Sequence, residues 1–388
     1  MPEKPDFIPV AKPLMDEREA AAARRAILSG WVTQGPEVAA FEREFAGYIG
    51  AEHACAVSSC TTALHLALLA VGVQAGDEVI TVSHSFIASA NSIRYCGATP
   101  VFVDIERRSF NIDAALIEPA ITGRTRAILC VHQLGMPCNL EAVLAIARAR
   151  GLRVVEDAAC AIGSEILWNG KLEKIGKPHA DVACFSFHPR KVITTGDGGM
   201  LTTSNEEWDK QFRLWRQHGM SVPDALRHGA KEVIFESYPV LGYNYRMTDV
   251  QAAIGREQLH RLPEILRDRR RLVERYRELL ADIPGLQLPE EPAWARSNWQ
   301  TFCVGLPDRC NQRRIMQAML DAGVATRRGV TSVHREQVYA GILGAQSLPV
   351  SEHASDHSIA LPLYSQMSRA EQDRVIEVLK LALSQHGR

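Results

Sequence analysis

Two ionisable residues follow apolar runs that have the composition of buried strands. The first is Lys191, which lies in a turn after the run at 181–187 and before glycines at 196, 198 and 199. Taken alone, a loop lysine is ordinarily a solvated side chain. At a strand end in an α/β cleft, however, a lysine can be desolvated, which would lower its pKa and leave a neutral amine able to form a Schiff base. The glycines precede a strand rather than open a helix, so they indicate a tight turn and not a dinucleotide-binding loop.

The second ionisable residue is Asp157, at the end of the run at 152–157. An acid in such a place is usually a helix cap or a turn residue. Alternatively, a carboxylate that faces a pyridinium nitrogen keeps this nitrogen protonated, so that the ring can accept electrons. Asp157 and Lys191 at strand ends are the pair that a pyridoxal phosphate enzyme requires. Hydroxyl residues at 58–62 open a predicted helix whose N–H groups would hold the phosphate, and N-capping by Ser59 or Thr61 is compatible with this role.

The elements that must position these residues alternate between strands and helices from about residue 50 to 205. The strand candidates are apolar throughout, which is typical of a mostly parallel sheet with helices on both faces, and the predicted fold class is α/β. Ligands bind such sheets at the carboxyl ends of the strands. We predict strands at 77–82, 100–105, 126–132, 152–157, 181–187 and 198–204, helices at 62–71, 87–96 and 140–150, and functional residues within 83–86, 132–133, 157–160 and 188–191.

A long helical pattern begins near residue 248, and Pro263 is predicted to kink or break it near 260–262. We therefore predict a large cofactor-binding domain with an N-terminal arm at 1–260 and a smaller α+β domain at 261–388. The basic run that starts at residue 267 is interleaved with glutamates and apolar residues, which favours a solvated helix face over a nucleic-acid site.

Composition limits the classes of function. The 388 residues carry a formal net charge of −1, so no overall basic field would attract nucleic acid or an anionic membrane. The nine cysteines form no C-x-x-C pair, which argues against a disulfide framework and a zinc ribbon, and we predict no metal site. The N-terminus lacks the apolar core of a secretory signal, and the apolar stretch at 54–73 has the pattern of a strand, a turn and a buried helix. A soluble cytoplasmic protein without nucleic-acid or membrane partners is expected.

Five segments, in chain order, resemble the signature segments of the DegT/DnrJ/EryC1/StrS family of sugar aminotransferases. They are SSCTTALHLALLAVG, GDEVITVSHSFIASANSI, VVEDAACAIG, FSFHPRKVITTGDGGM and GYNYRMTDVQAAIGREQL, and the similarity extends from about residue 29 to the C-terminus. This resemblance implies a fold type I pyridoxal phosphate enzyme that is active as a homodimer, with both active sites at the subunit interface.

The resemblance also implies roles for individual residues. Lys191 matches the lysine that forms the Schiff base, Asp157 the partner of the pyridine nitrogen, and Phe86 the aromatic residue stacked on the ring. Asn244 matches a residue that reaches the phosphate of the partner subunit. The remaining phosphate ligands implied in this way are Cys60, Thr61 and Ser186.

One position departs from the family pattern, because Cys160 stands beside the ring where the family has glutamine or histidine. A thiol is a weak hydrogen-bond partner, so the electronics of the ring oxygen or the shape of the site would differ. Arg327 and Arg328 could clamp a diphosphate or a carboxylate, although exposed arginine pairs are usually solvated. His188 and His334 are further candidates for substrate binding.

The predicted activity is a ping-pong transamination. According to the resemblance, L-glutamate donates the amino group and leaves pyridoxamine phosphate, which then aminates a keto sugar, foremost a nucleotide-linked one, for polysaccharide or natural-product glycan synthesis. Lys191 argues against a sugar dehydratase of the same fold, which carries histidine at this position. Two alternatives stay open: a cyclitol or other keto substrate without a nucleotide, and a cofactor-binding regulator without turnover.

Overall fold

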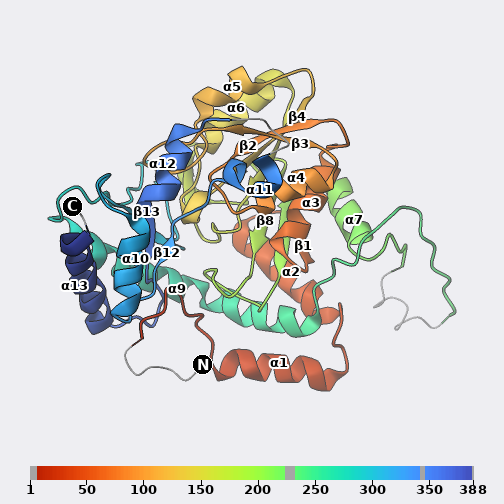
Figure 1. The fold of residues 1–388 in the computed structure, drawn as a ribbon. Helices are drawn as coiled ribbons and strands as arrows, with labels where there is room; N and C mark the ends of the chain where they lie inside the picture. The colour runs from red at the N-terminus through yellow and green to blue at the C-terminus, as the bar shows by residue number, and fades with distance from the viewer. Residues whose placement is uncertain (1–6, 223–231, 341–345, 387–388) are drawn as a thin grey trace.

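The computed structural model describes residues 7–222, 232–340 and 346–386, and its centre is a seven-stranded sheet (Figure 1). The strands lie in the order β1-β9-β8-β5-β4-β2-β3. The pairs β3/β2, β2/β4, β4/β5 and β5/β8 are parallel, and β9 runs antiparallel to both of its neighbours. The prediction of an α/β fold with a mostly parallel sheet is confirmed. The strands of this sheet are β1 (His53–Val57), β2 (Glu78–Val82), β3 (Thr99–Val103), β4 (Thr125–Val131), β5 (Arg153–Asp157), β8 (Val182–Ser186) and β9 (Gly199–Thr203).

The three helices predicted between the strands begin and end within two residues of the predicted positions, as α3, α4 and α6. The predicted helix at 140–150 is α6, and Asn139 caps it by accepting a hydrogen bond from the Ala142 N–H at 3.2 Å. The helices are α1 (Glu17–Ser29), α2 (Pro36–Ile49), α3 (Cys60–Ala70), α4 (Ala88–Tyr95), α5 (Ile117–Ala120), α6 (Leu140–Arg150), α7 (Glu206–Trp215), α9 (Asp249–Leu280), α10 (Gln312–Asp321), α11 (Gln337–Ala340), α12 (Pro349–His357) and α13 (Arg369–His386).

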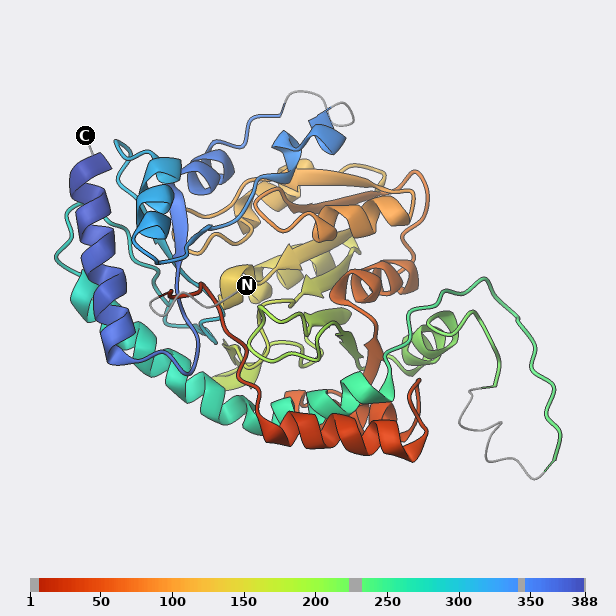
Figure 2. The same cartoon turned by 60° about the horizontal axis from the view of Figure 1, so that its bottom comes forward.

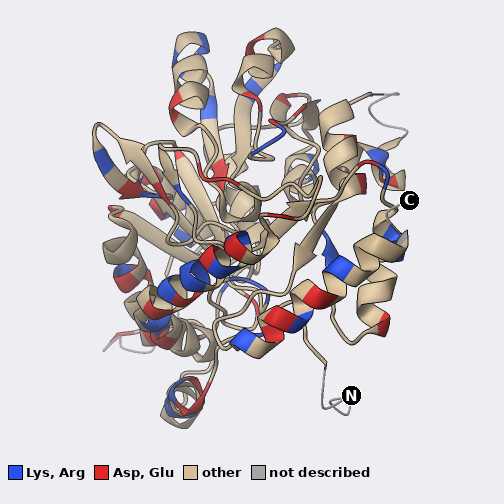
Figure 3. Cartoon of the chain, turned by 90° about the vertical axis from the view of Figure 1, so that its left-hand side faces the viewer, with Lys and Arg blue, Asp and Glu red and all other residues tan. Residues whose placement is uncertain are grey.

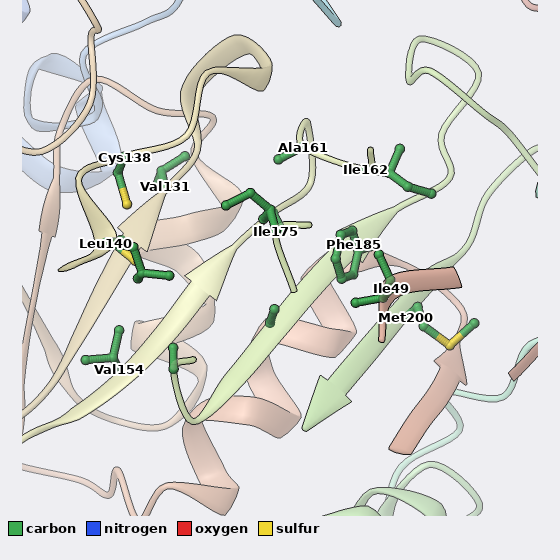
Figure 4. Close-up of a cluster of buried hydrophobic side chains, with 14 of the residues drawn as sticks. Ile49, Val131, Cys138, Leu140, Val154, Ala161, Ile162, Ile175, Phe185 and Met200 are labelled. Atoms are coloured by element: carbon green, nitrogen blue, oxygen red, sulfur yellow. The ribbon is translucent and has the colours of Figure 1, made fainter. Parts of the chain in front are cut away.

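The central sheet is buried on both faces because successive strand residues point to opposite sides. On one side, Val154 and Phe185 belong to a hydrophobic cluster that also contains Leu140 of α6 (Figure 4). On the other side, Val155 packs in a separate cluster with Leu64 of α3. This two-sided burial explains why the strands are apolar throughout rather than alternating.

Helix α9 runs without interruption through Pro263, so the predicted break near 260–262 is wrong. A proline inside a helix removes one backbone hydrogen bond and destabilises the helix by about 3 kcal/mol. Here Pro263 is exposed, whereas Leu262 and Ile265 are buried in the cluster against the large sheet, and Leu272 is buried in a second cluster. Each buried aliphatic side chain contributes about 1.5–3 kcal/mol, so packing on both sides of the proline outweighs the lost bond.

The C-terminal part folds around a small antiparallel sheet in the order β11-β13-β12, with α10 and α13 packed beside it (Figure 2). Its hydrophobic cluster contains Tyr276 of α9, Phe302 and, from the other end of the chain, Ile8. The backbone of Ile8 bonds to Gly323 and to Ala325, both at 2.9 Å. The proposed division of the chain within α9 remains a prediction. The strands outside the large sheet are β6 (Glu165–Trp168), β7 (Lys171–Lys174), β10 (Ala295–Arg296), β11 (Phe302–Gly305), β12 (Arg327–Arg328) and β13 (Ser358–Leu361).

Charges of both signs are interspersed along the long helices (Figure 3). In the basic run of α9, Arg271 is exposed and pairs with Asp268 at 3.0 Å, as expected for a solvated face. Arg269 is buried instead and donates to the carbonyl oxygen of Trp299 at 3.0 Å, so the prediction of a solvated face is wrong for this residue. None of the helices in the described ranges is long and apolar enough to span a lipid bilayer.

Candidate active site

The carboxyl ends of β5 and β8 and the start of α3 meet at one edge of the central sheet. Strand β5 ends at Asp157, β8 ends at Ser186, and α3 begins at Cys60. The two strands are parallel neighbours, with Asp157 opposite Cys184. The Cys60 thiol donates to the carbonyl oxygen of Cys184 at 3.6 Å, which attaches the start of the helix to β8. Three predicted site residues are therefore brought together.

Lys191 lies in the loop after β8. Its backbone N–H donates to the His188 carbonyl at 2.8 Å, and its amine donates to Cys160 Sγ at 3.1 Å. Cys160 follows Asp157 by three residues in the loop after β5, and its carbonyl accepts a hydrogen bond from Asn298 Nδ2 at 2.8 Å. The loops after the two strands thus place the amine of Lys191 against the thiol of Cys160, and the Asp157 carboxylate lies near enough to act on the charge of this amine.

The electrostatic surroundings of Lys191 differ from the prediction. Burial lowers the pKa of its amine, but the Cys160 side chain and the Asp157 carboxylate favour the charged form, and the pKa lies above its ordinary value of 10.5. The expected lowering of this pKa is therefore wrong. Burial also raises the pKa of the Cys60 thiol well above its ordinary value, so this thiol stays protonated near neutral pH.

The carboxylate of Asp157 is held at both oxygens. Ser89 Oγ, from the first turn of α4, donates to Oδ2 at 2.7 Å, and the Ala159 N–H donates to Oδ1 at 3.1 Å. Asp157 and Ser89 are both buried. The two donors compensate for the burial of the charge and fix the plane of the carboxylate.

The start of α3 has the geometry of an anion site. Ser59 caps the helix, because its Oγ accepts a hydrogen bond from the Thr62 N–H at 3.2 Å. The N–H groups of Cys60 and Thr61, at the first two helical positions, have no carbonyl partner within the helix. Such groups, together with the helix dipole, favour a phosphate.

Gly199, the first residue of β9, allows this helix start to lie directly against the start of β9. It stands opposite Ser186, and a Cβ on it would lie 2.4 Å from the carbonyl carbon of Ser59 and 2.7 Å from the nitrogen of Cys60. A side chain there would collide with backbone atoms. The amine, the carboxylate and this close-packed helix start fit the aldehyde, the ring nitrogen and the phosphate of pyridoxal phosphate.

Phe86 and Asn244 lie at the surface of the described chain. Phe86 precedes α4 and is 69% exposed, so its side chain is accessible to a stacking partner. Its carbonyl accepts the N–H of Ser89 at 3.1 Å, which places it near Asp157. Asn244 is exposed and its backbone pairs with that of Gln217. The next residue, Tyr245, accepts the N–H of Ser58 at 2.8 Å, which attaches this segment to the chain just before α3.

The candidates for substrate binding are spread over three regions. His188 is half-buried in the loop of Lys191, and its Nδ1 accepts the N–H of Arg190 at 3.2 Å. Arg327 and Arg328 form β12 of the small sheet and are exposed. His334 packs against the end of β2, where its Nδ1 and Ser83 Oγ are 2.6 Å apart and its Nε2 lies 3.2 Å from Glu352. The contacts bring only His188 next to Lys191.

Two residues that the sequence analysis did not single out support the site. Ser89 holds Asp157, and its spacing of four residues from Ser85 was the only sequence signal. Asn298 is fully buried and donates from Nδ2 to the carbonyls of Cys160 and Ile162, at 2.8 and 2.9 Å. It comes from a loop more than one hundred residues away, so no local pattern could have identified it.

Comparison with known proteins agrees with this chemistry. The model of the DegT/DnrJ/EryC1/StrS aminotransferase family matches residues 13–380. The spore coat polysaccharide biosynthesis protein SpsC of Bacillus subtilis is 37% identical over 380 residues, which are 96% of either chain.

Two solved aminotransferase structures share the fold over nearly their whole length. TlmJ from Streptoalloteichus hindustanus is 33% identical, with a TM-score of 0.89 over 98% of this chain and 99% of its own. Spr1654 from Streptococcus pneumoniae, solved in a PMP form, is 29% identical, with a TM-score of 0.91 over 97% of this chain and 99% of its own. The family model, the identity to SpsC and the arrangement around Lys191 lead to one conclusion: the chain belongs to the DegT/DnrJ/EryC1/StrS aminotransferase family and is a pyridoxal-phosphate-dependent aminotransferase.

Proposed function

We propose that this aminotransferase moves the amino group of L-glutamate to a keto sugar, foremost a nucleotide-linked one, for the synthesis of a polysaccharide or a glycosylated natural product. The observation that carries the proposal is the convergence of Lys191, Asp157 and the start of α3 at one sheet edge. The polysaccharide context of SpsC supports a sugar as the acceptor.

The chain's own residues divide the work. Pyridoxal phosphate, when bound, supplies a ring that accepts electrons from the carbon whose proton is removed. Asp157, held by Ser89 and Ala159, would keep the ring nitrogen protonated. Lys191 would bind the aldehyde and, once released as a free amine, would move the proton between donor and cofactor carbons. Phe86 would cover one face of the ring.

The phosphate would lie at the start of α3, where the backbone of Cys60 and Thr61 and the hydroxyls of Thr61 and Ser186 are the proposed donors. Cys160 is the proposed neighbour of the ring oxygen, since its thiol is within hydrogen-bond distance of Lys191. For the substrates we keep His188, Arg327, Arg328 and His334 as candidates, and an arginine fork suits either a carboxylate or a diphosphate.

A homodimer with shared active sites is part of the proposal. The segment that leads to Asn244 carries large apolar side chains in the open: Val233 is 84%, Phe235 90% and Leu241 85% exposed. Exposed apolar side chains that gather in one segment mark a surface that another protein covers. In the proposed dimer a second copy would cover this segment, and Asn244 would reach the phosphate of the partner subunit. The nine free thiols fit a reducing compartment, so we propose a cytoplasmic enzyme.

The central experiment maps the covalent bond between the protein and its cofactor. Borohydride reduction of the cofactor-saturated protein, followed by peptide mass spectrometry, should find the adduct on Lys191. The variant Lys191→Ala should bind the cofactor without an adduct and fail to complete transamination, whereas Lys210→Ala, which removes an exposed lysine, should behave as the wild type. An adduct on another lysine would refute the site.

The shared site is tested by mixing two inactive variants. Lys191→Ala and Asn244→Ala subunits should regain part of the activity when mixed, because one site of the mixed dimer contains neither lesion. Verified heterodimers without any activity would show that each site is built within one chain.

The acceptor is tested after the first half-reaction. The protein converted with L-glutamate is offered nucleotide-linked keto sugars, free keto sugars and a keto cyclitol, and return of the original absorbance spectrum identifies the acceptor. Return with a cyclitol alone would establish the first alternative. No conversion by any amino donor would establish the second, a regulator without turnover.

A further inference from the structure

A row of buried hydroxyl groups leads from the loop of Phe86 to the carboxylate of Asp157. Ser89 Oγ donates to Asp157 Oδ2 at 2.7 Å, and Ser85 Oγ lies 2.9 Å from Ser89 Oγ. All three side chains are at least nine-tenths buried. Their positions at the end of β2, in α4 and at the end of β5 mean that the row connects three elements.

The direction of these hydrogen bonds follows from counting protons. A serine hydroxyl has one proton, and that of Ser89 is directed to the carboxylate. Ser89 can therefore only accept from Ser85, so the proton of Ser85 points toward Ser89. Both hydroxyl dipoles are thus aligned toward the negative charge of Asp157, and aligned donors in a buried chain strengthen one another.

From this geometry we infer that Ser89 is a positioning residue for the reaction, with Ser85 supporting it. The inference rests on the proposed role of Asp157 at the ring nitrogen. Ser89 occupies one lone pair of Oδ2, and the Ala159 N–H occupies one of Oδ1, so the carboxylate cannot rotate. Its remaining lone pairs keep a fixed direction toward the cofactor.

The row also couples the ring-stacking residue to the carboxylate. Ser85 directly precedes Phe86, and the N–H of Ser89 donates to the Phe86 carbonyl at 3.1 Å. The loop that carries the stacking side chain is therefore fixed to the residue that orients Asp157. Movement of the loop would release the carboxylate, so the two contacts to the ring are set by one local structure.

The test compares variants of Ser89 in the cofactor-bound protein. In Ser89→Ala, kcat should fall by about tenfold to a hundredfold, because a hydrogen bond to a charged acceptor is lost, while the KM for the amino donor changes little. Ser89→Thr keeps the hydroxyl and should restore most of the rate. Ser92→Ala is the matched control, since Ser92 is buried in the same helix and its hydroxyl donates to the Ser89 carbonyl rather than to a carboxylate.

Two readouts do not depend on turnover. The dissociation constant for pyridoxal phosphate, titrated into cofactor-free protein, should rise about tenfold in Ser89→Ala. The ¹⁵N chemical shift of the labelled ring nitrogen should move toward that of the unprotonated ring, a change that a loss of stability alone would not produce. If Ser89→Ala does not fold, Ser89→Cys keeps the size and removes the strong donor.

The outcomes separate this inference from the proposed function. Normal affinity and an unchanged ring-nitrogen shift in Ser89→Ala or Ser89→Cys, with an active wild type, would refute the inference and leave the aminotransferase site intact. A wild type whose ring nitrogen is unprotonated, or whose adduct is not on Lys191, would refute the role of Asp157 or the site itself.

Discussion

From the buried side chain of His84 we predict how the stability of this protein depends on pH. Its side chain is fully buried at the end of β2, against the ring of Phe110, and neither ring nitrogen has a hydrogen-bond partner among the described residues. Burial lowers its pKa from 6.5 to about 4, and the nearby backbone of Ser351 and carboxylate of Asp104 offset this only in part. The folded protein therefore keeps this imidazole neutral at a pH where the unfolded chain protonates it.

The sign and the magnitude follow from this difference in pKa. Because folding lowers this pKa, the free energy of unfolding has its full value above pH 6.5, the pKa in the unfolded chain. It decreases as the pH falls toward 4, the pKa in the folded protein. Between pH 7 and pH 5 the loss amounts to about 2 kcal/mol, and complete loss to about 3 kcal/mol. The variant His84→Phe fills the same apolar site without a titrating group, so it should lack this part of the acid destabilisation.

The assay is urea unfolding of the wild type and of His84→Phe at pH 7.0, 6.0 and 5.0. The quantity compared is the change in unfolding free energy with pH, because other titrating groups then cancel. His260→Gln, a change at an exposed histidine, is the control and should retain the wild-type dependence. If His84→Phe loses as much stability as the wild type between pH 7 and pH 5, the buried neutral imidazole is not the cause.

Further substitutions test the packing around the site. Gly199→Ala should weaken pyridoxal phosphate binding at least tenfold in a fluorescence titration, because its Cβ would lie 2.4 Å from backbone atoms of Ser59, whereas Gly47→Ala, which meets nothing within 4 Å, should bind normally. Asn298→Ala removes three hydrogen bonds of a buried side chain and should destabilise the protein by about 2–4 kcal/mol in chemical denaturation. A loss below about 0.5 kcal/mol would contradict this. Asp249→Asn replaces a carboxylate that accepts three N–H groups at the start of α2. We expect the free energy of unfolding to fall by about 1–2 kcal/mol in the same measurement. An unchanged stability would contradict this prediction.

Local sequence patterns predicted the order of the elements because each pattern reflects burial at that place in the chain. The strand at 152–157 and the helix at 140–150 were found within a residue, since an apolar run and a capped helix carry their own boundaries. Pro263 misled the prediction because the packing that keeps α9 continuous comes from distant parts of the chain.

From the sequence, we could predict only those site residues that lie at or just after the end of a predicted strand. Asp157 and Lys191 were placed by the rule for parallel sheets and by the resemblance. The role of Ser89 depends on a contact across 68 positions, and the raised pKa of Lys191 depends on Cys160 lying beside its amine. Such contacts belong to the tertiary structure, and neither the residue types nor their spacing determine them.

The pairing of Ile8 with residues 323–325, just before β12, imposes an order on the synthesis and folding of this chain. Its partners, Gly323 and Ala325, leave the ribosome more than three hundred residues later, and Leu363, which donates to the Val10 carbonyl at 3.1 Å, later still. At typical rates of translation this delay is roughly 15 to 60 seconds. During that interval the strands of the large sheet can pair with one another, while the segment around Ile8 stays exposed to solvent. The segment around Ile8 is therefore made long before it is secured, and a chain stalled before residue 323 would carry a finished sheet with this segment unattached.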